Sequence, residues 1–384
     1  MGVIFLLIGA GVRKQHIQVH PNWGFAPHQK INQLAVYTLP YDMLPFYKSH
    51  INYLASHAVD PDRRRYSSPY EAIRHYIDMD YWEGKDIPPP KHWNTFARSH
   101  YVLIRVHEGD TTEKVSTQQV VGGRDTSQMT RYLDTLAMNM YWHLPEWIPL
   151  DTFIGKDSAW PPGHYFMKME GVHHGIVPWH VQRIYSSLVR SFERHEWAKV
   201  IRLSSDLGHY VADAHVPLHT TSNYNGQQTD QIGIHAFWET RIPEVLGASF
   251  NLYAGKADYV EDVASWIWKV VHTSYEMVDT VLTKEREVAG DLPSALQYSY
   301  VERNGRWERK ESTKFSIQYE MAIHKMVERR MRQTIKDVGS IWMTAWVDAG
   351  QPDLPGKPIL VDTYASGYQD TLEYQIDHSS CHPD

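Results

Sequence analysis

The sequence predicts an all-α fold, a single large and mainly helical domain that carries an irregular insertion. Apolar residues recur at helical spacing in several long segments, whereas the alternation typical of β-strands is weak throughout. The composition, with 42% apolar and 22% charged residues over 384 positions, is typical of a globular chain that buries a sizeable core.

The first expected helix begins near Pro27, because proline suits the first helical position and Ile31, Leu34 and Ala35 share one face. A second helical segment is expected from Tyr41 to His57, followed by a loop over the charged stretch DPDRRRYSSPYEA. Further helices are expected over roughly residues 74–82, 179–214, 259–282 and 315–346.

Residues 84–178 are the least regular part of the chain, with PPP at 88–90 and WPPG at 160–163. We expect an insertion-rich, partly helical region there, inside one domain that covers residues 23–350. Residues 351–384 include Pro352 and Pro355 near their start and are expected to form a mobile tail.

Residues 1–22 are expected to be a leader. The apolar run from Val3 to Val12 is shorter than the about 20 residues that span a bilayer, but it has the length of a signal-peptide core. No Lys or Arg precedes the run, so a buried or disordered N-terminal segment is the alternative. The leader predicts an exported protein, either periplasmic or secreted.

The charge balance limits the classes of partner. The chain has 38 Lys plus Arg against 45 Asp plus Glu, which gives a net charge of -7. Proteins that bind nucleic acid through broad electrostatic attraction are usually basic, so that class is disfavoured, while a local basic groove stays open. Cys381 is the only cysteine, and no internal disulfide can form.

Histidine occurs 23 times, and five ligand-type side chains cluster within one stretch of 31 residues. His209 and Asp213 stand four apart on an expected helix, so they share one face and can share an ion. His219 follows after a Pro-Leu turn, and His235 and Glu239 repeat the spacing of four. One such pair is commonly a surface contact, but two pairs joined by another histidine predict a metal site.

Earlier segments offer further ligands. Hydrolytic metal sites combine histidines with carboxylates and leave a position open for water. Cysteine is absent from this set, which argues against a structural zinc finger. The earlier candidates are His28, Asp60, Asp62, His75, Asp78 and Asp80.

With these motifs the chain resembles the zinc-dependent phospholipase C and S1/P1 nuclease superfamily, from Trp23 to about Asp353. The family's H-x3-D-x3-PLH arrangement is matched at His209, Asp213 and 217–219, and its closing pair is matched at His235 and Glu239. The matches in the first part of the chain are Trp23, His28, Asp60 and His75, the last within the family-like phrase HYID.

The resemblance implies a mostly helical domain with a trinuclear zinc site. It assigns zinc one to Asp60, His75, His209 and Asp213. It assigns zinc two to His219, His235 and Glu239. It assigns zinc three to His28, to Asp213 as a bridge, and to the free amine and carbonyl of Trp23. Because 22 residues precede Trp23, that amine is free only after processing at this position.

Clustered divalent ions suit the hydrolysis of a phosphodiester, because they neutralise its charge and lower the pKa of bound water toward about 7. Asp60 and Asp78 are the candidate catalytic residues. Asp78 and Asp80 are candidates for orienting ligands or for proton transfer, with a solvated acidic loop as the alternative. Arg63 to Arg65 are expected to be a solvated run of charge, with contact to phosphate as the alternative.

The predicted function is therefore a zinc-dependent phosphoric ester hydrolase, a phosphodiesterase similar to phospholipase C that uses metal-activated water. Glu239 stands where the nucleases of the family have Asp, and the nuclease-type GGN segment is absent, so a phospholipid head group is favoured as substrate. An S1/P1-type single-strand nuclease or nucleotidase is the alternative with the same zinc cluster. A non-catalytic, metal-stabilised binding module is the alternative from another class. No stable protein partner is inferred.

Overall fold

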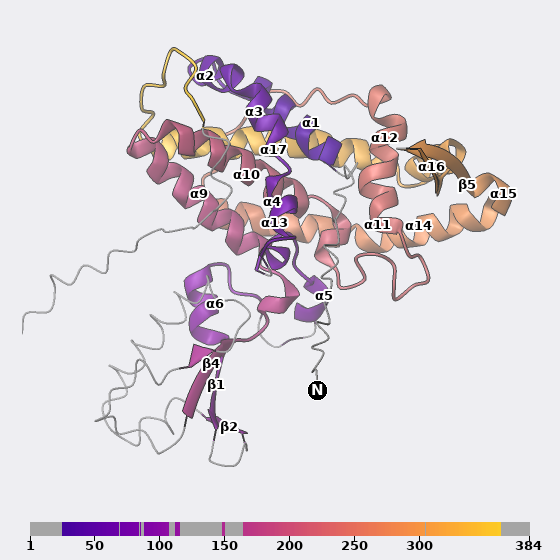
Figure 1. Cartoon of the computed structure of the whole chain (residues 1–384), viewed down its shortest axis with the longest axis horizontal. Coiled ribbons are helices and arrows are strands. Elements are labelled where there is room, and N and C mark those ends of the chain that lie inside the picture. Colours follow the sequence, from indigo (N-terminus) through magenta and orange to yellow (C-terminus); the bar gives the residue numbers. More distant parts are fainter. Residues whose placement is uncertain are drawn as a thin grey trace, which may run out of the picture.

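The computed structural model describes residues 25–68, 70–83, 85, 88–106, 112–115, 148–149, 164–303 and 305–361. These residues form a mostly helical body, from one side of which a small sheet projects (Figure 1). The prediction of a mainly helical chain is therefore confirmed.

Helix α10 (Trp197–Ala214) lies at the centre of the body, and every residue from Ser204 to Ala214 is buried. A helix buried on all sides cannot send its polar side chains into solvent, so they must find partners inside the protein. The longer helices packed against α10 are α1 (Phe25–Ala35), α9 (Val177–Glu193), α13 (Val263–Tyr275) and α17 (Met326–Asp348), and the short helices at 51–56 and 60–64 also contact it.

The N-terminal helices are shorter than predicted. The segment 41–57 is two helices that break at His50, and the expected loop after it begins with a helix, α4. The segment 74–82 holds the end of a 3-10 turn and a four-residue helix, with an extended link between them. The elements here are η1 (Val36–Thr38), α2 (Leu44–Ser49), α3 (Ile51–Ser56), α4 (Asp60–Arg64), η2 (Ala72–Arg74) and α5 (Met79–Trp82).

The later predicted helices are each divided in two. The break between α9 and α10 contains His195, and the break before α17 contains His324 and Lys325, all with φ near +55°. A left-handed residue cannot continue a right-handed helix. The remaining elements are η4 (Val172–His174), η5 (Pro217–Thr220), α11 (Ile234–Ala236), η6 (Phe237–Arg241), α12 (Ile242–Leu246), η7 (Gly247–Ser249), α14 (Val278–Asp291), α15 (Ser294–Gln297) and α16 (Thr313–Ala322).

The structure also contains strands, which the sequence analysis did not predict. Within the insertion, α6 (Trp93–Ser99) is followed by β1 (Tyr101–Val106), and only Leu103 of that strand is buried. Because only one position of β1 is buried, its sequence shows little of the alternation that predicts a strand. Its partner strand β4 (His164–Met169) is also distant in the chain. An antiparallel sheet of order β2-β1-β4-β3 includes β2 (Thr112–Val115) and β3 (Ile148–Pro149), and β5 (Tyr298–Arg303) pairs with β6 (Arg306–Glu311).

The first part of the predicted tail packs against the body. Leu354, Ile359 and Val361 are partly buried against the core. The Ile359 amide donates a hydrogen bond to His50 Nε2 at 3.1 Å. Residues 351–361 are therefore held by contacts rather than free, while 362–384 lie outside the described residues.

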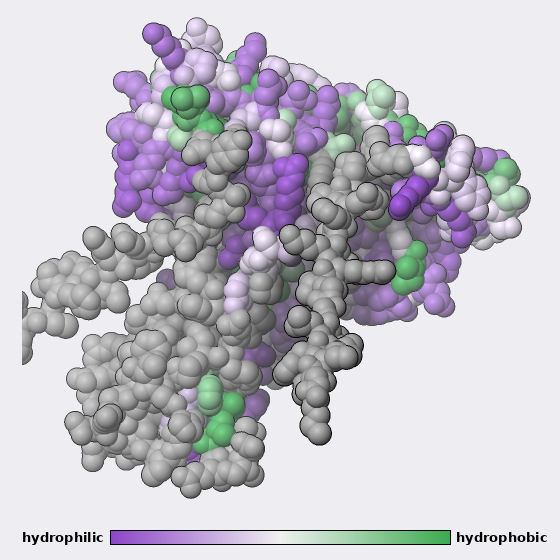
Figure 2. Space-filling model, viewed as in Figure 1, coloured by the Kyte–Doolittle hydropathy of each residue, from purple (hydrophilic) through white to green (hydrophobic). Residues whose placement is uncertain are grey.

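Hydrophilic residues cover most of the visible described surface of the body, and hydrophobic ones appear in small groups (Figure 2). Of the helices that the structure describes, none is both long and apolar enough to span a bilayer. The predicted leader, residues 1–22, lies outside the described part of the chain.

Gly208 allows α1 to approach α10 closely. A Cβ atom at this position would lie 2.0 Å from Asn32 Oδ1. The buried Asn32 amide donates to two backbone carbonyls at 3.1 and 3.0 Å, so it cannot move without losing them. We expect Gly208→Ala to lower the free energy of unfolding by about 1–3 kcal/mol, as measured by denaturant titration.

Gly290→Ala is the matched control, because a Cβ there meets no described atom within 4 Å and the residue also lies in a helix. Alanine is the better helix former by up to about 1 kcal/mol. This variant should be neutral or more stable, and equal losses in both variants would contradict the close contact.

Candidate metal centre

Side chains from α1, α4, α10, η5, α11 and η6, with His75 just after η2, converge in the middle of the body. Their ligand atoms form three groups, and within each group the atoms lie within 4.8 Å of one another. Such groups can hold metal ions. The groups are Asp62, His75 and His209; His28, His209 and Asp213; and His219, His235 and Glu239.

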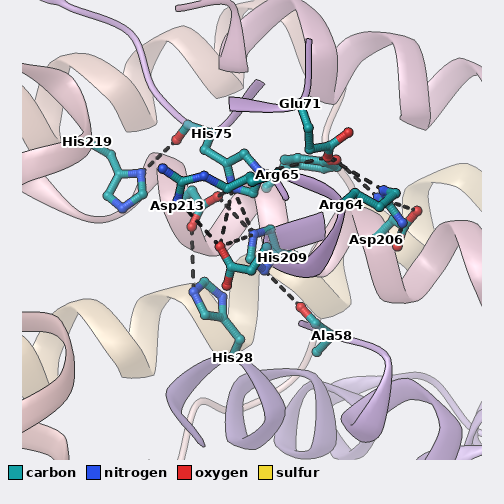
Figure 3. Close-up of polar contacts among 12 residues, drawn as sticks. His28, Ala58, Arg64, Arg65, Glu71, His75, Asp206, His209, Asp213 and His219 are labelled. Atoms are coloured by element: carbon teal, nitrogen blue, oxygen red, sulfur yellow. Dashed lines mark hydrogen bonds and ion pairs between the residues drawn. The ribbon is translucent and has the colours of Figure 1, made fainter. Parts of the chain in front are cut away.

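The pair on α10 has the geometry that its spacing predicts. His209 and Asp213 lie on one face of the buried helix, and His209 Nε2 is 3.2 Å from Asp213 Oδ2. The carboxylate is 1% exposed, and a charge that deep needs a cationic partner or a metal. Figure 3 shows His28, His75 and His209 grouped around Asp213.

Asp213 lies beside the group formed by Asp62, His75 and His209. His75 Nδ1 lies 3.0 Å from His209 Nε2 and 2.9 Å from Asp213 Oδ2. Asp62 Oδ1 lies 3.9 Å from each of the two histidine nitrogens. A tetrahedral zinc ion with bonds of about 2.0–2.1 Å has ligand–ligand edges of about 3.3 Å. The group of Asp62, His75 and His209 could therefore hold one ion, with the Asp213 carboxylate beside it.

Asp62 stands in this set where the sequence analysis assigned Asp60, and the assignment of Asp60 is corrected. Residues two apart on a helix point to opposite sides, since each residue turns it by about 100°. The Asp60 carboxylate faces His57 and Arg63 instead, at 2.6 and 2.8 Å. Recognising a helix at 60–64 would have separated the two carboxylates by face.

The group of His219, His235 and Glu239 lies on the later part of the chain. Glu239 Oε2 lies 2.8 Å from His235 Nε2 and 3.5 Å from His219 Nε2. Glu239 lies on η6, a single π-helical turn, which is a form frequent at functional sites. An ion held by these three ligands would have a position left for water, which is typical of catalytic zinc sites.

His28 lies between Asp213 and Glu239, and so links the ligands on α10 to the group of His219, His235 and Glu239. Its Nε2 lies 3.6 Å from Asp213 Oδ1 and 3.2 Å from Glu239 Oε1. The two oxygens of Asp213 therefore face different histidines, as expected of a bridging carboxylate. Trp23, the other predicted ligand of a third ion, lies outside the described residues.

Backbone carbonyls orient three of the histidines. The Nδ1 atoms of His209, His219 and His235 lie 2.8, 2.7 and 3.2 Å from carbonyl oxygens. Each of these rings thus turns its Nε2 atom toward the carboxylates. Ligand histidines typically donate their second nitrogen in this way, which fixes the ring and its tautomer.

Glu71 supports His75 from behind, and the sequence analysis did not find it. Its carboxylate is 1% exposed, lies 3.7 Å from His75 Nε2 and accepts a hydrogen bond from Tyr210. Arg74 and Arg64 approach it at 2.9 and 3.6 Å. Burial alone would raise the pKa of Glu71, but His75 and the two arginines hold it well below its usual range.

The side chains of the cluster shift each other's pKa values. Burial alone would lower the pKa of His28 and His219, but the carboxylates of Asp213 and Glu239 raise each to about 9. Burial likewise opposes ionisation of those carboxylates, yet the histidines hold their pKa values well below the usual range. The cluster is thus built to hold positive charge between its carboxylates.

One face of the cluster opens into a cavity of about 600 Å³. Its wall includes Arg65, whose guanidinium lies 3.6 Å from Asp62 Oδ1. Arg64 pairs with buried Asp206 at 3.0 Å, so the prediction of a solvated charge is wrong for Arg64, whereas Arg65 is exposed as predicted. The other polar or aromatic residues of the wall are His75, Tyr76, Asp78, His219, Thr221, Ser222, Tyr224, Asn225 and His235.

Asp78 and Asp80 have different surroundings. Asp78 lines the cavity, and burial together with the nearby charge of Asp80 raises its pKa to about 7. Asp80 accepts hydrogen bonds from the side chains of Thr221 and Ser222 and from the Ser222 amide. Asp78 is therefore placed for proton transfer, and Asp80 for holding the loop that carries the ligand group of Glu239.

The donor set fits zinc. The Nε2 atom of His219 is buried with no hydrogen-bond partner among the described residues, and it faces Glu239. Nitrogen and carboxylate ligands at these separations suit Zn²⁺.

No protein-family model matches the chain, and no curated protein matches it.

Proposed function

We propose that the protein is a zinc-dependent hydrolase of phosphodiesters, with two zinc ions bound firmly and a third at His28. Three neighbouring groups of metal-ligand side chains, with His75, His219 and His235 on the wall of one cavity, carry this proposal. Bound divalent ions supply the charge that neutralises a phosphodiester and activates water for attack on phosphorus.

The chain's own residues supply the remaining chemistry. Arg65 can donate two parallel hydrogen bonds to phosphate oxygens, as guanidinium groups commonly do. Asp78, with a pKa of about 7, can hold a proton near neutral pH and give it to the departing oxygen. Asp60 has no part in this scheme, because its carboxylate is paired with His57 and Arg63.

The three-ligand group supports an enzyme over a non-catalytic binding module. A structural zinc site has all four positions filled by protein. His219, His235 and Glu239 offer only three ligand atoms, and His219 and His235 lie on the cavity wall, so a bound ion would have a fourth position for water. Export to the periplasm or beyond is part of the proposal and follows from the apolar run at Val3–Val12.

A phospholipid head group is the substrate that we favour. At a net charge of -7 the protein gains little long-range attraction for a polyanion, and a zwitterionic head group needs none. Single-stranded nucleic acid is the second candidate, because Tyr76 and Tyr224 on the cavity wall can stack on bases.

The proposal is tested by metal analysis together with substrate assays. Protein purified without chelator should contain at least two zinc ions per chain. It should hydrolyse bis(4-nitrophenyl) phosphate, and it should cleave phosphatidylcholine faster than single-stranded DNA at physiological salt. Activity that survives a strong chelator would refute zinc dependence, whereas a preference for DNA would overturn only the lipid assignment.

A further inference from the structure

Asp78 lies on the extended link between η2 and α5, and the turn that contains η4 holds this link in place. The Asp78 amide donates to the His174 carbonyl at 2.7 Å. The Tyr76 hydroxyl donates to the His173 carbonyl at 2.9 Å. Segments nearly 100 residues apart in the chain are thus joined at the wall of the cavity.

Two glycines shape the turn for this close contact. Gly171 and Gly175 have φ values of +83° and +89°, which L side chains rarely adopt. A Cβ at Gly175 would lie 2.0 Å from the Tyr76 carbonyl oxygen. The backbone of the turn therefore lies directly against the link that carries Asp78.

The His174 ring is clamped against the same link. Its Nδ1 atom lies 3.1 Å from Asp78 Oδ2. Its face stacks on Tyr81, with 3.5 Å between ring centres and 15° between planes. Lys85 Nζ lies 3.7 Å from the centre of the Tyr81 ring. This array restricts rotation of the imidazole and so fixes the position of Nδ1.

Charged neighbours set the protonation of both groups. Burial and Asp80 favour the neutral form of Asp78 and raise its pKa to about 7. Burial and Lys85 lower the pKa of His174, and Asp80 opposes this only in part. Near neutral pH the imidazole is therefore neutral and carries a single N–H, while Asp78 exchanges a proton.

We propose that His174 is a positioning residue for Asp78, whose Oδ2 accepts from Nδ1–H so that the acidic proton lies on Oδ1. This inference deepens the proposed function and rests on it. As water adds to phosphorus and gives up a proton to solvent, the P–O bond to the leaving group breaks and its electron pair stays on the leaving oxygen. The proton of Oδ1 passes to that oxygen, and the Asp78 carboxylate regains a proton from solvent.

The test is His174→Phe, which keeps an aromatic ring to stack on Tyr81 and removes the nitrogen that faces Asp78. His173→Phe is the matched control, because His173 is the exposed neighbour in the same turn and has no side-chain bond to Asp78 in the described structure. His174→Asn restores an amide donor near the position of Nδ1. Zinc content is measured in all three variants and should match the wild type.

We expect kcat of His174→Phe to fall on the order of tenfold, part of the about 100-fold that a general acid supplies, with KM nearly unchanged. The Nδ1–H bond favours the carboxylate, so its loss should raise the pKa of Asp78. In the pH profile of kcat, the limb at high pH should therefore move to higher pH, by about one unit. His173→Phe should leave this limb at its wild-type pH, and His174→Asn should partly restore the wild-type profile.

Several results would overturn the inference. One is a kcat loss of equal size at every pH, and another is a limb that moves to lower pH. The Asp78 carboxyl is also titrated by ¹³C NMR in zinc-loaded wild type, His174→Phe and His173→Phe. This titration needs no turnover, so an unshifted Asp78 in His174→Phe contradicts the positioning role even if the protein fails to cleave phosphodiesters. A shifted Asp78 without phosphodiesterase activity would support His174 and reject the proposed function.

Discussion

Asp62→Asn is expected to release zinc and abolish phosphodiesterase activity together. Asp62 lies 3.9 Å from the facing nitrogens of both His75 and His209, and an amide is a far poorer zinc ligand than a carboxylate. Loss of an outer partner alone costs about 10–100-fold in metal affinity, so loss of a direct ligand should exceed about 100-fold. Elemental analysis after dialysis, with an assay on the same sample, measures both effects.

Asp60→Asn is the matched control, two residues away on the same short helix. It breaks contacts with His57 and Arg63 that are partly exposed and is expected to keep zinc and activity near the wild-type values. The reverse outcome, with zinc lost from Asp60→Asn and kept in Asp62→Asn, would restore the assignment made from the sequence.

Removal of zinc is expected to lower the melting temperature, because binding energy at such a site is also folding energy. Zinc at about 1,000 times its Kd contributes about 4 kcal/mol, which corresponds to a shift of about 5 °C for a chain of 384 residues. Thermal denaturation followed by circular dichroism, with and without a strong chelator, measures this difference.

The difference should also grow as pH rises from 6.5 to 9. In the chelated protein, His28 and His219 have pKa values of about 9, against about 6.5 in an unfolded chain. A raised pKa contributes stability that is fully present below pH 6.5 and is lost as pH rises through 9. In the zinc-loaded protein these histidines stay neutral, so its stability does not fall in this way. A difference in melting temperature that stays constant or shrinks between pH 6.5 and 9 would contradict this explanation.

The sequence alone predicted those parts of the site that depend on local geometry. His209 and Asp213, like His235 and Glu239, are four residues apart, and the pitch of a helix brings such pairs to one face. The structure brings each pair into a ligand group. The mainly helical fold class was predicted in the same way, because the spacing of apolar residues within one segment shows which face of a helix is buried.

Only the tertiary structure decided the features that depend on contacts between distant segments. Asp62 rather than Asp60 faces His209, and the phase of a five-residue helix that packs against α10 makes that choice. Glu71 supports His75 through contacts with Tyr210 and two arginines that no local pattern reveals.

The strands and the helix breaks were missed for the same physical reason. Strand β1 buries only Leu103 and is stabilised by β4, which lies about 60 residues further along the chain. The apolar periodicity continues through His195, so it does not reveal the break there. The packing of α9 against α10 determines where the first helix ends and the second begins. Periodicity reports which side chains can be buried together, whereas packing between segments determines where each element begins, ends and finds its partner.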